Sequence, residues 1–166
     1  MTGDDALLVL AQQLGRACAE RGMLLATAES CTGGLLAGAI TEVPGSSDWF
    51  DRGFVTYSYE AKTELLGVAP DTLTHCGGVS EETAREMVAG ALQRSRAQLA
   101  VAITGIAGPG GGMPGKPVGM VCFAWGSKAG RTHVATHHFE GDRMAVRRQS
   151  VVVALEGLLS EIGRSA

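Results

Sequence analysis

Short apolar runs alternate with amphipathic segments along this chain, and this alternation constrains the fold more than any other feature of the sequence. Residues 23–28 and 99–104 form two such runs, and residues 53–58 form a third strand candidate. A continuous apolar run of strand length is typical of a sheet that is covered on both faces. Because helical patterns separate these runs, the order of elements predicts an α/β fold.

Helical periodicity and capping residues predict four main helices. The predicted helical segments are residues 4–21, residues 33–43, a helix capped by Ser80 and a last helix capped by Asp142. Residues 118–125 and 131–139 alternate like the two strands of an antiparallel hairpin. Since 166 residues fit one domain, we expect a three-layer single domain over residues 1–166, with a mixed sheet covered by helices on both faces.

The charge and hydropathy of the chain argue against several classes of protein. The formal net charge of -3 and the pI of about 5.8 lack the basic footprint of a nucleic-acid-binding domain. No apolar stretch reaches the roughly 18 residues of a membrane span. The acids of MTGDDALLVL precede its apolar residues, which is the reverse of a secretory signal. We expect a cytoplasmic protein that binds neither nucleic acid nor a membrane.

The cysteines and histidines do not form the pattern of a metal site. Cys18, Cys31, Cys76 and Cys122 lie far apart with no CxxC pair, which matches neither a zinc site nor a disulfide framework. Three histidines alternate along the predicted strand at residues 131–139, and no carboxylate cluster accompanies them. We interpret the cysteines as reduced thiols and the histidines as residues of a surface strand, and we expect no metal ligand.

The segment TAESCTGG follows the first apolar run and precedes a predicted helix. If that helix begins near Thr32 or Gly33, its free N–H groups and the positive end of its dipole stabilise a nearby anion or tetrahedral oxyanion. Gly33 and Gly34 allow a ligand to approach the backbone. Ser30, Cys31 and Thr32 are therefore candidate nucleophiles, and the alternative is that Ser30 or Thr32 serves only as the helix N-cap.

Tyr57 and Lys62 follow the second strand candidate, in the segment VTYSYEAK. A lysine that is partly withdrawn from water loses affinity for its proton and can act as the general base for a serine. Tyr57 can relay a proton or hold the lysine in place. The alternative is that Lys62 is a solvated residue at the start of a helix.

A glycine-rich loop follows the third strand candidate. Six glycines lie between Gly105 and Gly115, so this loop can present backbone N–H groups to a ligand, and Thr104 adds a hydroxyl at its start. The loop matches neither GxxxxGK[ST] nor GxGxxG, and the alternative is a flexible hairpin tip. Arg143 and Arg147 are i,i+4 neighbours on the last helix. They can hold a phosphate monoester, or they belong to a solvated basic face.

Five stretches of the sequence together resemble the CinA C-terminal domain family. They are TAESCTGG, PGSSDWFDRGFVTYSYEAK, GGVSEETAREM, TGIAGPGGG followed by KPVG, and GDRMAVRRQ, and the similarity extends from about residue 7 to residue 160. The resemblance implies a CinA C-terminal-like fold and the activity of the family's stand-alone nicotinamide-nucleotide amidohydrolases. These enzymes convert nicotinamide mononucleotide to nicotinate mononucleotide and ammonia. The resemblance also implies a homodimer and a reaction that requires no metal or redox cofactor.

The family is described as serine–lysine amidohydrolases, so the resemblance implies Ser30 as the nucleophile and Lys62 as its base. It places Tyr57 and Thr104 in the pocket, with the glycine loop and an arginine of the last helix on the substrate phosphate. The substrate-binding residues expected on this basis are Glu29, Thr32, Gly33, Gly34, Thr104, Gly105, Gly108, Arg143 and Arg147. Cys31 is the rival nucleophile, because a helix N-terminus lowers the pKa of a thiol.

Two other functions stay open at this point. One is a non-catalytic nucleotide-binding module in competence or DNA-damage responses, and the other is an amidase for a different substrate. Tyr59 stands where relatives often carry asparagine, which alters a wall of the pocket. The chain begins almost directly at the deamidase region, so we expect the stand-alone form without the molybdopterin-binding-like domain of full-length CinA proteins.

Overall fold

A five-stranded mixed sheet forms the middle layer of the computed structural model, which describes residues 3–165. Its strands, in spatial order, are β2 (Phe50–Val55), β1 (Leu25–Glu29), β3 (Leu99–Gly105), β4 (Met120–Ser127) and β5 (Thr132–His138). The first three strands of this order run parallel, and β4 and β5 are antiparallel to their neighbours. The expected mixed sheet and its terminal hairpin are therefore confirmed.

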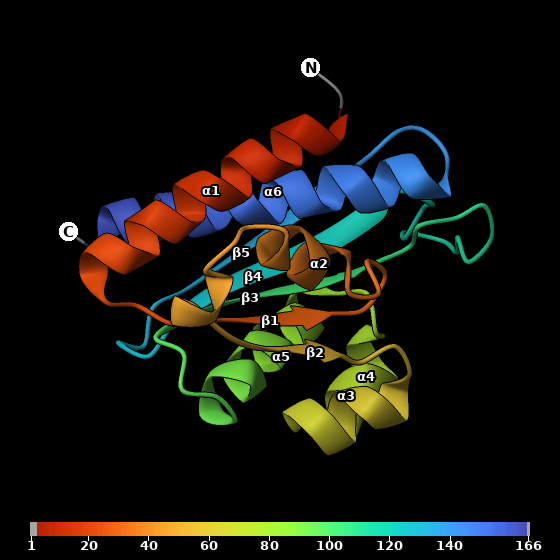
Figure 1. The fold of residues 1–166 in the computed structure, drawn as a ribbon. Helices are drawn as coiled ribbons and strands as arrows, with labels where there is room; N and C mark the ends of the chain where they lie inside the picture. Colours follow the sequence, from red (N-terminus) through yellow and green to blue (C-terminus); the bar gives the residue numbers. More distant parts are fainter. Residues whose placement is uncertain (1–2, 166) are drawn as a thin grey trace.

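Helices cover both faces of this sheet, as Figure 1 shows. One face carries α1 (Gly3–Arg21), α2 (Leu35–Thr41) and α6 (Arg143–Arg164), and the other carries α3 (Tyr59–Leu66), α4 (Pro70–Cys76) and α5 (Glu81–Gln93). No helix within residues 3–165 combines the length and the apolar character that a membrane crossing requires. The three-layer α/β architecture expected from the sequence is confirmed.

The two faces of the sheet bury side chains of different size. Val101 and Ile103 of β3 pack under α1 and α6, whereas Ala100 and Ala102 of the same strand face α5. This follows from the two-residue period of a strand, in which successive side chains point to opposite faces. Small side chains allow α5 to lie close to the sheet. Gly90 of α5 also lies against the end of α3.

Several boundaries differ from the sequence-based expectation. The helix expected from residue 33 begins at Leu35, because Gly33 and Gly34 have φ angles of 57° and 103° in the left-handed region. The strand expected at 53–58 lies instead at Phe50–Val55, since Ser58 caps α3 by accepting a hydrogen bond from the Ala61 N–H. The helix α4 and the 3₁₀ helix η1 (Ser46–Asp48) were not expected, and α3 was expected only in the alternative that placed a solvated Lys62 at the start of a helix.

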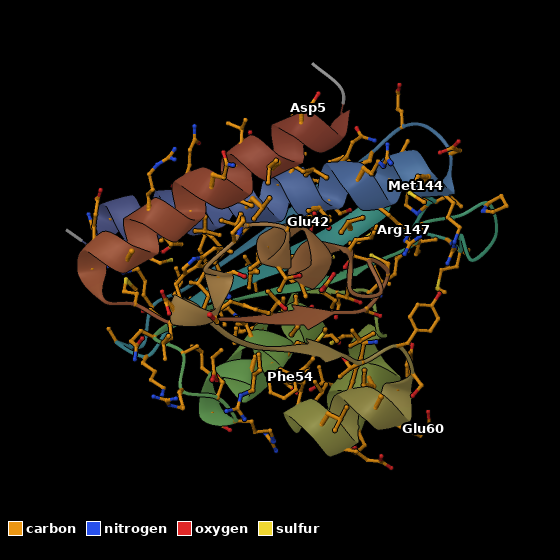
Figure 2. The ribbon with its side chains drawn as sticks, in the orientation of Figure 1. Asp5, Glu42, Phe54, Glu60, Met144 and Arg147 are labelled. Atoms are coloured by element: carbon orange, nitrogen blue, oxygen red, sulfur yellow. The ribbon has the colours of Figure 1, made fainter. Side chains whose placement is uncertain are left out.

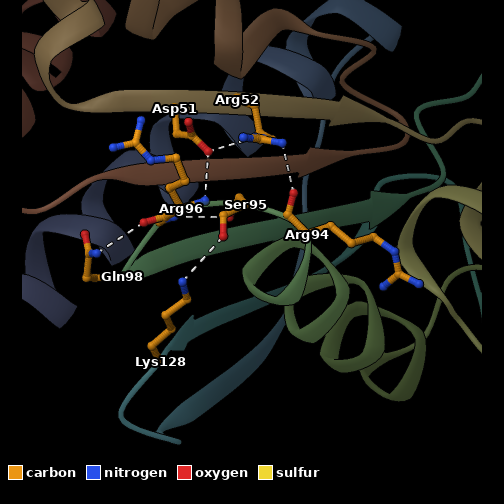
Figure 3. A network of polar contacts seen from close by, with 8 residues as sticks. Asp51, Arg52, Arg94, Ser95, Arg96, Gln98 and Lys128 are labelled. Atoms are coloured by element: carbon orange, nitrogen blue, oxygen red, sulfur yellow. Dashed lines mark hydrogen bonds and ion pairs between the residues drawn. The ribbon is translucent and has the colours of Figure 1, made fainter.

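A polar network closes the end of the sheet at which β1 and β3 begin (Figure 3). Asp51 accepts hydrogen bonds from the Arg52 guanidinium and from the Arg96 N–H, and Lys128 donates to the Ser95 carbonyl. The segment between α5 and β3 is thereby attached both to β2 and to the turn of the β4–β5 hairpin. These contacts do not involve the opposite end of the sheet, where the parallel strands finish.

Candidate active site

The parallel strands β1, β2 and β3 finish side by side and align three hydroxyl residues. Ser30 directly follows β1, and its N–H donates to the Ile103 carbonyl at 2.9 Å. Thr56 directly follows β2, and its N–H donates to the Glu29 carbonyl at 2.9 Å. Thr104 occupies the corresponding position in β3, because Glu29 pairs in register with Ile103. Ligands of open α/β sheets bind at this kind of edge.

Lys62 reaches this row from the first turns of α3. Its Nζ donates to the Ser30 Oγ at 2.9 Å, to the Thr56 carbonyl at 2.8 Å and to the Tyr57 carbonyl at 3.3 Å. The lysine side chain is buried, with 2% of the residue exposed. All three partners are uncharged oxygens, and burial lowers the pKa of Lys62 to about 8. The alternative of a solvated lysine is therefore wrong.

Glu29, and not Ser30 or Thr32, satisfies the N-terminus of α2. Its buried carboxylate accepts hydrogen bonds from the Leu36 N–H at 2.9 Å and the Ala37 N–H at 3.1 Å. The cap residue itself, Gly34, makes no side-chain hydrogen bond. The alternative in which Ser30 or Thr32 serves only as the helix N-cap is therefore wrong, because the last residue of β1 supplies the acceptor. Ser30 Oγ is consequently available to Lys62.

Arg147 of α6 holds the turn that carries the nucleophile candidates. Its Nε donates to the Cys31 carbonyl at 3.1 Å and its Nη2 to the Thr32 carbonyl at 3.2 Å. The same arginine lines a second cavity together with Gly33 and Gly34. Asp5 of α1 and Glu42 at the end of α2 also line that cavity, and Figure 2 labels both of them with Arg147.

The cavity that contains Ser30 and Lys62 has a volume of about 320 Å³. Its other lining residues include Cys31, Tyr57, Tyr59, Gly77, Gly78, Thr104, Gly105, Gly108, Lys116 and Arg143. Of the residues expected to bind substrate, the structure brings Thr104, Gly105, Gly108 and Arg143 to this cavity. Glu29, Thr32, Gly33, Gly34 and Arg147 do not line it. Over the described part of the chain, its lining includes two further cations and no carboxylate side chain.

Arg143, one helical turn before Arg147, connects Tyr57 to the glycine-rich loop. Its Nη2 donates to the Tyr57 hydroxyl at 3.1 Å, and its Nη1 donates to the Gly108 carbonyl at 2.8 Å. Tyr57 therefore contacts Lys62 through its backbone carbonyl, while its exposed ring extends to Arg143. Within the described residues it is the Tyr57 main chain that contacts Lys62, and the two expected roles of Tyr57 stay predictions.

Lys116 was not among the expected site residues, and Tyr59 was expected only as part of a pocket wall. The Tyr59 hydroxyl accepts a hydrogen bond from the Gly78 N–H at 2.9 Å, and Lys116 donates to the Cys76 carbonyl. A signal for each exists in the sequence. Tyr59 lies three residues before Lys62 and so shares its helix face, and Lys116 is the cation within the loop rich in glycine and proline.

Cys31 lines the same cavity but lacks the character of a thiolate. The residue is 5% exposed, and burial raises the pKa of its thiol to about 12. The lowering expected from a helix N-terminus does not occur, because desolvation of the charged form outweighs the neighbouring cations. The nucleophilic form of a cysteine is the thiolate, so Cys31 is a weaker candidate than Ser30 at neutral pH.

Comparison with known proteins gives the same family as the sequence motifs. The family model described as the CinA C-terminal domain matches residues 8–162. The nicotinamide-nucleotide amidohydrolase PncC of Escherichia coli strain K12 is 51% identical over 93% of this chain and 94% of that protein. PncC of Pseudomonas putida is 50% identical over 93% of this chain and 96% of that protein.

Solved structures agree with this assignment. The crystal structure of the competence/damage inducible protein CihA from Agrobacterium tumefaciens superposes with a TM-score of 0.91 and 47% sequence identity, covering 93% of this chain and 94% of that one. The competence damage-inducible protein A from Klebsiella pneumoniae has a TM-score of 0.91 at 39% identity, covering 95% and 97%. The resemblance found in the sequence is thereby confirmed, and this chain belongs to the CinA C-terminal domain family.

Proposed function

We propose that this protein hydrolyses the carboxamide of nicotinamide mononucleotide, giving nicotinate mononucleotide and ammonia in pyridine nucleotide recycling. Ser30 is the nucleophile and Lys62 is its base. The observation that carries the proposal is the 2.9 Å contact between Lys62 Nζ and Ser30 Oγ inside a cavity. The substrate is suggested by the names of the relatives that are about half identical to this chain.

The partners of Lys62 orient its proton-accepting lone pair. The Thr56 and Tyr57 carbonyls can only accept hydrogen bonds, so they bind the two hydrogens of a neutral amine. The remaining position on Nζ faces the Ser30 Oγ. A neutral Lys62 therefore directs its lone pair at the serine hydroxyl, which is the arrangement that general-base activation requires.

The reaction then proceeds by two acyl transfers. Ser30 Oγ bonds to the carboxamide carbon while its proton passes to Lys62 Nζ. The resulting tetrahedral intermediate collapses, the C–N bond breaks, and Lys62 returns the proton to the departing nitrogen, which leaves as ammonia. Water attacks the acyl-serine after giving a proton to Lys62, which reprotonates Ser30 as the nicotinate carboxyl group forms. The oxidation state of the carbonyl carbon stays the same throughout.

The oxyanion of this intermediate needs N–H donors beside Ser30. The donors first expected lie around Thr32 to Gly34, but the Gly33 N–H donates to the Ser30 carbonyl at 3.0 Å. Gly33 and Gly34 also line the second cavity. Cys31 directly follows the nucleophile and lines the cavity that contains it. We therefore assign the Cys31 N–H as an oxyanion donor.

The charge of the cavity suits a nucleotide monophosphate. Arg143 and Lys116 bring two cations to its lining beside the glycine-rich loop. A guanidinium and backbone N–H groups are common partners of phosphate oxygens. The cavity volume of about 320 Å³ also falls within the range of small-molecule sites, about 300–1,000 Å³. We assign the phosphate to Arg143, with Lys116 as a second cation in the same cavity.

The pH profile tests the role of Lys62 as a base. Burial places the pKa of Lys62 near 8, and only its neutral form accepts the serine proton. We expect kcat/KM to rise by about tenfold in total between pH 7 and 9.5, with roughly half of the final value reached near pH 8 and a plateau above pH 9. Ammonia release should be measured between pH 7 and 9.5, because the substrate phosphate, with a second pKa of about 6, is at least about nine-tenths doubly ionised there. A flat profile over this range contradicts the assignment.

Ammonia release from nicotinamide mononucleotide is the direct test of the function. The wild type should release ammonia, Ser30→Ala and Lys62→Ala should lose nearly all of this activity, and Cys31→Ser should keep most of it as the matched control. Full activity in Ser30→Ala with loss in Cys31→Ser would transfer the role to the cysteine. Nucleotide binding without ammonia release would favour the binding-module alternative, and activity only on another amide in a substrate panel would favour a different amidase.

A further inference from the structure

Thr104 stands beside the nucleophile with its hydroxyl hydrogen already engaged. Its Oγ1 donates to the Gly78 carbonyl at 2.5 Å, and the residue is 1% exposed. Ala28 and Ala102 pack on the α5 face of the sheet, so the next even positions, Ser30 and Thr104, continue that face on neighbouring strands. Both residues line the cavity. The unused lone pairs of Thr104 Oγ1 are therefore available to a bound ligand.

A hydroxyl in this state can only accept a hydrogen bond from a ligand. A carboxamide has an NH₂ group that can donate to it, whereas an ionised carboxylate has two acceptors and no donor. To donate to a carboxylate, Thr104 would have to turn its hydrogen away from Gly78 O. That carbonyl is buried, and no other donor reaches it within the described residues.

We propose that Thr104 is the residue that distinguishes the amide substrate from the acid product, an inference that rests on the proposed function. The amide NH₂ donates to Thr104 Oγ1, which leaves the amide carbonyl directed to the other side, toward the Cys31 N–H. The carboxylate formed by hydrolysis places an acceptor against Thr104 and loses this hydrogen bond. The product consequently leaves more readily than the substrate, and the enzyme resists inhibition by its own acid product.

The test measures binding without turnover, in a Ser30→Ala parent protein at pH 9, where Lys62 is mostly neutral and attracts the carboxylate least. Calorimetry gives the Kd of three ligands: nicotinamide mononucleotide, nicotinate mononucleotide and 3-acetylpyridine mononucleotide. The third has a methyl group in place of the amide nitrogen and cannot donate. We expect the parent to bind the amide about tenfold more tightly than either other ligand, as one lost hydrogen bond implies.

Adding Thr104→Val to the parent should remove most of this preference, and Thr104→Ser, which keeps the hydroxyl, should retain it. If the Thr104→Val variant prefers the amide over the other ligands by the same ratio of Kd values as the parent, the proposal is overturned. Because a Val variant can fail to fold, the parent alone gives a second criterion, since equal Kd values for the amide and the acetyl ligand also overturn it. Wild-type ammonia release is measured in parallel. An active wild type with no Thr104 effect rejects only this inference, whereas no release and no binding of any ligand rejects the proposed function as well.

Discussion

Replacing Lys62 with methionine is expected to lower kcat/KM for ammonia release by about 10³-fold, while the protein still folds. The variant removes the base, and general-base catalysis contributes about 10²–10⁴-fold. Methionine has a similar length and needs no solvation, so it suits a site that is 2% exposed. The Thr56 and Tyr57 carbonyls lose their hydrogen bond from Lys62, which lowers the stability of the protein. This loss offsets the gain in stability from no longer burying an amine. We expect the Tm to stay close to that of the wild type.

Two further variants make this result specific. Lys128→Met removes a lysine at the far end of the sheet, where its Nζ contacts only the Ser95 carbonyl among the described residues, and it should leave kcat/KM unchanged. The double variant Ser30→Ala, Lys62→Met should be no slower than Ser30→Ala alone, because the two groups act as one unit. A Lys62→Met enzyme within tenfold of the wild type, or a double variant with multiplied losses, contradicts the dyad.

Replacing Gly90 with alanine is expected to lower the free energy of unfolding by about 3 kcal/mol. A Cβ at this position would lie 1.9 Å from the Leu66 carbonyl oxygen, which is backbone at the end of α3 and cannot swing aside. The two helices must move apart. For a domain of this size the change corresponds to a fall in Tm of roughly 10 °C, which thermal unfolding followed by circular dichroism measures.

Gly163→Ala is the matched control, because the residue is also helical and, beyond its own helix backbone and chain neighbours, no atom of residues 3–165 lies within 4 Å of a Cβ there. It should stabilise the protein slightly, by about 0.5–1 kcal/mol. Gly90→Ala should also lower kcat/KM, because α3 carries Lys62 and a displaced α3 changes the distance from Nζ to the Ser30 Oγ. Equal Tm values for the two variants would show that α3 and α5 can separate without penalty.

The sequence predicts the layers of this fold better than it predicts the contacts of the site. The apolar runs and the caps at Ser80 and Asp142 are local signals, and the structure confirms both caps. The dyad is different, because Ser30 and Lys62 are 32 positions apart. Their contact depends on β2 pairing beside β1 and on the point at which α3 begins after a strand that ends earlier than expected. From the residues alone, Lys62 could be interpreted either as a catalytic base or as a solvated lysine.

The two arginines of α6 illustrate why the remaining contacts were not predictable. Arg143 and Arg147 lie on one face of the helix, and the i,i+4 spacing treats them alike. They are one helical turn apart, and the cavity ends between them, so that Arg143 lines it and Arg147 does not. Arg143 reaches Tyr57, whereas Arg147 reaches the carbonyls of the nucleophile turn. Glu29 was missed as a cap for a similar reason, because its partners belong to another element.

The way Lys62 is held has a consequence for how much sequence variation the site can tolerate. Apart from Ser30, the partners of Lys62 Nζ among residues 3–165 are the main-chain carbonyls of residues 56 and 57. A carbonyl is present whatever side chain a residue carries. The position of the base is thus set by the path of the chain as it leaves β2, and not by the identity of the side chains around it. Homologous proteins can therefore exchange side chains there, and adapt the rest of the pocket to different ligands, while keeping the same proton acceptor in place.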